Sequence, residues 1–110
     1  MSLVKYHNVD GSTSTIKELI SPGRNIGNVS SIIICNTNAS SSATVTLYIE
    51  SNISGQSSQR FNILKSLEII SKSTLFLEGS DIPSFNNSES GYGLYIEVGG
   101  SDTLDVLITV

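Results

Sequence analysis

Apolar and polar residues alternate strictly along Ala43-Thr-Val-Thr-Leu-Tyr-Ile-Glu50. Successive side chains of a β-strand point to opposite faces, so this period of two predicts a half-buried strand. Just before it, residues 29–36 contain three consecutive isoleucines, which favours a central strand covered on both faces. Residues 36–42 between them are rich in Asn, Ser and Thr and have the composition of a turn. We therefore expect the two strands to pair as a long hairpin at the centre of a β-sandwich.

Alternating or β-branched segments recur along the rest of the chain. They predict further strands at residues 3–9, 13–20, 59–70, 74–78, 92–98 and 103–110. The first is expected at a sheet edge, and the long strand 59–70 is expected to kink near Ser66. A short helix over residues 15–20 is the alternative for the second. Polar loops are expected at 51–58 and 79–91, and Gly99-Gly-Ser-Asp102 has the composition of a hairpin turn.

Seven or eight short strands separated by turn signals are typical of a sandwich. The fold class expected is therefore all-β: one antiparallel β-sandwich domain over residues 1–110, jelly-roll or immunoglobulin-like (Ig-like), with no substantial helix. The two strand orders share this pattern and both stay open. A chain of 110 residues is long enough to bury a core without disulfides, and its single cysteine allows no internal one.

Charge and hydropathy narrow the classes of partner. The net charge is −4, and the six Lys and Arg residues are scattered singly. Affinity for nucleic acid comes mainly from Lys and Arg that neutralise phosphates, so we expect no nucleic-acid binding. No basic segment followed by an apolar one opens the chain, and no apolar run approaches the roughly 20 residues of a membrane span. We therefore expect neither a secretory signal nor a membrane anchor.

Candidate reactive groups are few. His7 is the only histidine and lies in a predicted edge strand, where a surface or packing role is expected. Cys35 follows the isoleucines, so we expect it to pack in the core as a small apolar side chain. A calcium site would need loop carboxylates to converge, and the candidates are Asp81, Glu89, Asp102 and Asp105. They lack the spacing of a calcium loop. We therefore predict no enzyme activity, no metal and no cofactor.

Large side chains on the expected outer faces suggest a contact surface instead. Tyrosine is favoured at protein interfaces because it combines an apolar ring with a polar tip. The candidate interface residues are Tyr48, Tyr95, Leu107, and Ile32 or Ile34.

Several of these segments together resemble small virion structural proteins of tailed phages, of the marine cyanophage type. The segments that carry the resemblance are Ser21-Pro-Gly23, Ser31-Ile-Ile-Ile-Cys-Asn-Thr37, Ala43-Thr-Val-Thr-Leu-Tyr-Ile49, Thr74-Leu-Phe-Leu-Glu-Gly79 and the two alternating strands that end the chain. The sequence departs from that group at Ile70-Ser-Lys-Ser73, where the group has a turn of the Pro-Ala-Gly type.

The resemblance implies a non-enzymatic virion protein, a capsid decoration or a tail or neck component assembled in the host cytoplasm. Its partners would be copies of itself, with a trimer favoured, and other virion proteins. No catalytic residues carry over.

Two alternatives remain. One is a carbohydrate-binding jelly-roll module of a fibre or adhesin, with glycan candidates Tyr92, Tyr95, Phe85, Asn86 and Asn87. The other is a small cupin-like enzyme, which would need several metal-binding histidines where this chain has one.

Overall fold

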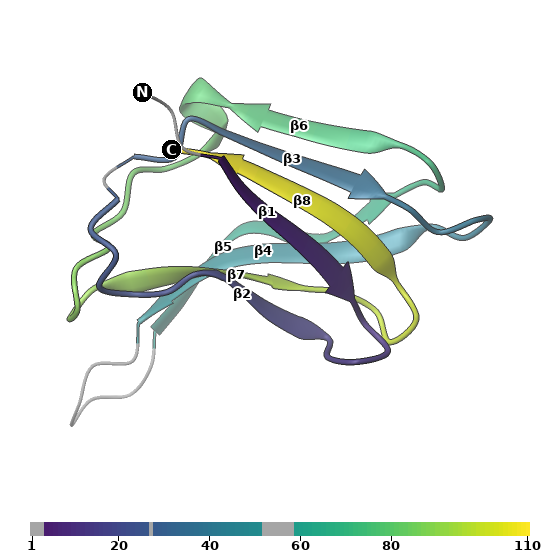
Figure 1. Cartoon of the computed structure of the whole chain (residues 1–110), viewed down its shortest axis with the longest axis horizontal. Coiled ribbons are helices and arrows are strands. Elements are labelled where there is room, and N and C mark those ends of the chain that lie inside the picture. The colour runs from purple at the N-terminus through teal and green to yellow at the C-terminus, as the bar shows by residue number, and fades with distance from the viewer. Residues whose placement is uncertain (1–3, 27, 52–58) are drawn as a thin grey trace.

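The computed structural model describes residues 4–26, 28–51 and 59–110. Its strands form two four-stranded antiparallel sheets that lie face to face (Figure 1). Sheet A has the order β1-β8-β3-β6, and sheet B has the order β2-β7-β4-β5. The elements are β1 Val4–Asp10, β2 Ile16–Ile20, β3 Ser31–Asn36, β4 Ala43–Ser51, β5 Gln59–Ile69, β6 Thr74–Glu78, a 3-10 turn at Gly79–Asp81, β7 Tyr92–Glu97 and β8 Thr103–Thr109. The prediction of an all-β sandwich is confirmed.

The strand order distinguishes the two topologies that the sequence left open. Strand β1 pairs with β8, β2 with β7, β3 with β6, and β4 with β5. The first strand thus pairs with the last, the second with the second-last, and so on inward to β4 and β5. Successive pairs alternate between the two sheets. A double Greek key wound in this way is a jelly roll.

The predicted central hairpin is wrong. Strand β3 lies in sheet A between β8 and β6, whereas β4 lies in sheet B between β7 and β5. Each is central in its own sheet, and residues 37–42 cross from one sheet to the other. The turn at residues 99–102 likewise joins β7 in sheet B to β8 in sheet A, so it is not a hairpin turn. Alternation reports which face of a strand is covered, not which strand is its neighbour.

Most strand positions agree with the sequence prediction. Strand β1 is an edge strand, as expected, and β2 is a strand and not the alternative helix. Ser66 has a φ of 50° beside register shifts in the β4–β5 pairing, which confirms the kink. Its backbone N–H donates to the Thr46 hydroxyl at 3.0 Å. Of the predicted loop over residues 51–58, Ser51 is instead the last residue of β4. Residues 52–58, like Leu3 of the first predicted strand, lie outside the described residues.

The core fills the space between the inner faces of the two sheets. Its completely buried side chains come from central strands of both sheets: Ile32, Ile34, Ala43, Val45, Leu47, Leu94, Ile96, Val106 and Ile108. In β3 only alternate residues are buried, and Ile33 and Cys35 are partly exposed on the outer face. The expectations that β3 is covered on both faces and that Cys35 lies in the core are therefore wrong. A two-layer sandwich covers only one face of each sheet.

A buried asparagine satisfies the backbone where the β3–β4 and β5–β6 connections cross between the sheets, at the right in Figure 1. The side chain of Asn36 is fully buried. Its amide nitrogen donates to the carbonyl oxygens of Ser41 at 3.1 Å and Ile69 at 2.8 Å. Its side-chain oxygen accepts the N–H of Asn38 at 2.8 Å. These bonds take the place of the ladder that a crossing segment lacks.

Asn38 and Asp102 extend this network to the β7–β8 connection. The Asn38 amide donates to the Asp102 carboxylate at 3.2 Å, and its oxygen accepts the Thr103 N–H at 3.0 Å. The other Asp102 oxygen accepts the N–H groups of Gly99 at 2.8 Å and Thr44 at 3.2 Å. Both acceptor oxygens of this buried carboxylate are thus used inside the protein.

Asn87 has the same role at the opposite end of the sandwich. Its amide donates to the carbonyl oxygens of Ser21 at 3.0 Å and Tyr92 at 2.8 Å, and its oxygen accepts the Ile26 N–H at 3.4 Å. It therefore joins the segment that follows β2 to the segment that precedes β7.

We predict that Gly11→Ala lowers the free energy of unfolding by about 2–3 kcal/mol, the cost of overpacking a well-packed site. The Gly11 N–H donates to the Asp102 carbonyl at 2.8 Å, and a Cβ at position 11 would overlap the carbonyl oxygen of Gly99. Urea denaturation measures the change. Gly100→Ala is the matched control, because a Cβ there meets no atom within 4 Å, and we expect a change below about 0.5 kcal/mol. Equal effects of the two substitutions would contradict the prediction.

Candidate interaction surfaces

The outer face of sheet A carries a row of apolar side chains that crosses all four strands. The strand register places Tyr6 opposite Leu107, Leu107 opposite Ile33, and Ile33 opposite Phe76. All four point away from the core, because the fully buried residues of these strands occupy the alternate positions. Tyr6 is 73% exposed and Phe76 is 52% exposed, while Leu107 and Ile33 are half-buried. We call these four residues the apolar row.

Acidic residues flank the apolar row. Asp10 and Asp105 lie outward on one side of it, and Glu78 lies outward on the other. The outward positions of β1, β8, β3 and β6 carry no Lys or Arg. Sheet A therefore presents an apolar stripe in acidic surroundings.

The outer face of sheet B is closed by contacts within the chain. The rings of Tyr48 and Tyr95 stack with their centroids 5.6 Å apart. The Arg60 guanidinium lies 3.9 Å from the centroid of the Tyr48 ring, and its ion pairs reach Glu50 at 3.1 Å and Glu97 at 3.7 Å. Tyr48 is consequently only 2% exposed, although it points away from the core. An arginine over a tyrosine ring is favourable because the ring face is negative.

Burial changes the acidity of both stacked tyrosines. It raises the pKa of Tyr95 to about 12, with a further contribution from the nearby Glu18 carboxylate. It also raises the pKa of Tyr48, although the positive charge of Arg60 acts in the opposite direction. The stack therefore favours the neutral phenols.

The residues predicted as one interface lie in three different places. Leu107 belongs to the apolar row on sheet A, and Tyr48 and Tyr95 lie on the opposite side of the sandwich. Ile32 and Ile34 are 0% exposed between the sheets, so their prediction as surface contacts is wrong. A run of three isoleucines does not reveal which alternate set faces inward.

Sequence reasoning missed three members of the apolar row: Tyr6, Ile33 and Phe76. The alternation over residues 3–9 already separates Tyr6 from His7 and could have indicated it. Phe76 lies between two leucines, so its outward direction follows only once β6 is paired with β3. The row itself depends on a register among segments that are far apart in the chain.

The structure does not gather the glycan candidates. Tyr92 and Tyr95 are an odd number of residues apart on β7, so they point to opposite faces of the strand. Asn87 is buried and its side chain holds the backbone, while Phe85 packs half-buried against the core. Asn86 is exposed.

Within residues 4–26, 28–51 and 59–110, no three His, Cys, Asp or Glu side chains lie together as a metal site would require. No helix among the same residues is long and apolar enough to cross a membrane.

We predict that the protein loses stability as the pH rises from 10 toward 12. Tyrosine in the unfolded chain ionises near 10, whereas the raised pKa keeps Tyr95 neutral in the folded protein until about 12. Between pH 10 and 12 the tyrosine loses its proton in the unfolded chain but keeps it in the folded protein. Rising pH therefore favours the unfolded state, and the stabilisation present below pH 10 disappears. Urea midpoints across this range measure the loss. Tyr95→Phe should make the decline shallower, and an unchanged slope in that variant would contradict the assignment.

No family model matches this chain, and a search of curated proteins also finds no match.

Proposed function

We propose that this protein is a structural component of a tailed-phage virion that acts through protein–protein contacts. The single structural observation that carries the proposed contact is the apolar row on sheet A. Its contact partner in the proposal is a neighbouring copy of the chain, with other virion proteins bound by the assembly.

The apolar row has the composition of a contact surface. Tyr6 and Phe76 are large aromatic residues, and each is more than half exposed. Aromatic residues are enriched at protein interfaces, and a contiguous exposed apolar patch frequently marks a binding surface. Full burial of such a side chain contributes about 1.5–3 kcal/mol, so covering the row would stabilise a contact appreciably.

The charges around the row favour one type of assembly. If two copies met through identical sheet A faces, Asp10, Asp105 and Glu78 of both would crowd into one contact without a Lys or Arg from either face. Like charges brought together oppose association. A contact between sheet A and a different surface of the next copy avoids this repulsion. Contacts of that head-to-tail kind form a closed ring when the rotation from copy to copy completes a full turn, and a ring of three copies is the trimer that we propose.

The assignment to a phage virion rests on the resemblance of the strand segments to small virion proteins. The jelly-roll strand order is compatible with it, because viral capsid domains use this topology. Lectin domains and cupins use it too, so the topology alone does not select a function.

We predict that the wild-type protein is an oligomer at about 50 µM and that Phe76→Ser shifts it toward the 11.7 kDa monomer. The substitution removes an exposed aromatic ring from one end of the apolar row, and truncation of an aromatic hot-spot residue costs about 2 kcal/mol or more of binding. Light scattering coupled to size-exclusion chromatography gives the mass. We expect at least a tenfold weaker association.

The matched control is Phe61→Ser. Phe61 is 54% exposed, nearly the same as Phe76, but it lies on β5 in the other sheet. This variant should keep the wild-type mass. A wild-type monomer at this concentration, or equal dissociation of the two variants, would overturn the contact.

A separate test addresses the virion. We predict that the reading frames next to the gene for this chain encode capsid, neck or tail proteins. Sequencing of the flanking DNA checks this. A position within a metabolic operon would remove the virion assignment while leaving the oligomer test unaffected.

A further inference from the structure

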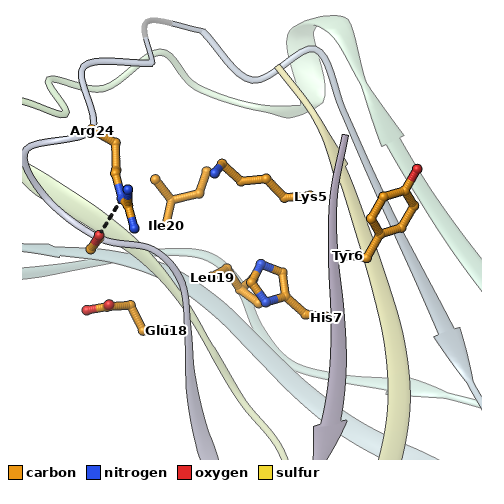
Figure 2. Close-up of a pocket in the computed structure, with 8 residues that line it drawn as sticks. Lys5, Tyr6, His7, Glu18, Leu19, Ile20 and Arg24 are labelled. Atoms are coloured by element: carbon orange, nitrogen blue, oxygen red, sulfur yellow. Dashed lines mark hydrogen bonds between the residues drawn. The ribbon is translucent and has the colours of Figure 1, made fainter. Parts of the chain in front are cut away.

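A cavity of about 360 Å³ opens between the edge strands of the two sheets, and Figure 2 shows it in close-up. Strand β1 borders it on sheet A, and β2 with the segment after it borders it on sheet B. The residues that line it include Lys5, His7, Glu18, Leu19, Ser21 and Arg24. The jelly roll thus leaves a recess where β1 and β2, which do not pair, lie near each other.

Positive charge gathers in this recess of an otherwise acidic protein. Two of the six Lys and Arg residues, Lys5 and Arg24, line it, and neither forms a salt bridge with any part of the chain that the structure describes. In Figure 2, Lys5 extends from β1 toward Ile20 and Arg24, whereas Tyr6 points to the other side of the strand. Glu18 also lines the recess but forms no salt bridge with either cation within the described residues, so the recess holds two cations against one carboxylate.

A hydrogen bond fixes Arg24 at the recess. Its Nε donates to the Ser21 hydroxyl at 3.1 Å. This uses one of the five N–H groups of the guanidinium and leaves the others for a ligand. A guanidinium held in place binds oxygen anions with a smaller loss of side-chain entropy than a free one.

His7 adds a polar atom that has no partner within the described residues. Its Nε2 is buried and makes no hydrogen bond. Burial lowers the pKa of His7, an interaction with the Leu19 backbone acts in the opposite direction, and the charges of Lys17 and Lys5 lower it further. The other charged groups near it are Glu18 and Arg24 in the recess and Asp105 from β8, which lines a smaller cavity on the outer side. The imidazole is therefore neutral near pH 7, with a ring nitrogen left unpaired.

We propose that this recess binds an oxyanion, a phosphate or a carboxylate group, held by Lys5 and Arg24 beside the His7 ring. The two cations supply the charge that an anion needs, and the volume suits a small ligand. When the anion binds, its negative charge favours protonation of the nearby His7, which takes a proton from solvent. Binding is therefore expected to strengthen as the pH falls from 7 to 6.

Because the chain has one histidine, its ring resonances report on this site directly. We predict that inorganic phosphate shifts the His7 resonances in a saturable way in NMR titrations and raises the pKa of His7. Glutarate, titrated separately, tests a carboxylate. A response to phosphate alone identifies a phosphate site, a response to glutarate alone identifies a carboxylate site, and a response to both supports a general oxyanion site. No saturable response to either ligand overturns the proposal.

Charge-matched variants separate this recess from a general attraction of anions. Lys5→Gln with Arg24→Gln should weaken binding at least tenfold, while Lys65→Gln with Lys72→Gln, which makes the same charge change at exposed positions elsewhere, should change it less than twofold. Equal weakening in both pairs would overturn the site. The pKa shift of His7 in the wild-type protein does not depend on how the variants fold. Neither test depends on the oligomeric state, so failure of the anion site would not count against the proposed virion role, and the reverse is also true.

Discussion

The fold depends on hydrogen-bond partners for the backbone N–H and C=O groups where the chain crosses between the sheets. In a jelly roll, consecutive strands mostly lie in opposite layers, and here only β4 and β5 are consecutive neighbours within one sheet. A crossing segment leaves the hydrogen-bond ladder, and its buried N–H and C=O groups need other partners. Asn36, Asn38 and Asp102 supply them at one end and Asn87 at the other. The abundance of asparagine in the loops thus has a structural role.

The outward-pointing aromatic side chains are covered on one sheet of the sandwich and exposed on the other. On sheet B, Arg60 and a second tyrosine ring cover Tyr48, so the aromatic surface is used within the chain. On sheet A, Tyr6 and Phe76 have no comparable cover and stay open to solvent. Outward direction alone therefore does not identify a contact surface. The two faces differ in whether other side chains of the same chain cover the outward aromatic rings.

The recess between β1 and β2 follows from the same topology. These consecutive strands end different sheets, so no ladder joins them and the sandwich is open along this side. Residues that point inward on an edge strand reach this opening instead of the centre of the core. Lys5 and His7 occupy such positions on β1, whereas Val9, two residues further along the strand, is buried.

The local sequence determined the strands, the kink at Ser66 and the inward residues of β4, β7 and β8, because alternation, β-branching and turn residues act over a few positions. Only the tertiary structure decided which strands pair. The isoleucines of β3 are compatible with either face and with several partners, and the choice is made by residues about 40 and 70 positions away in β6 and β8. The apolar row arises from that pairing and joins side chains from segments distant in the chain, which no local pattern records. The recess lies between consecutive strands and exists because β1 and β2 belong to different sheets and do not pair with each other.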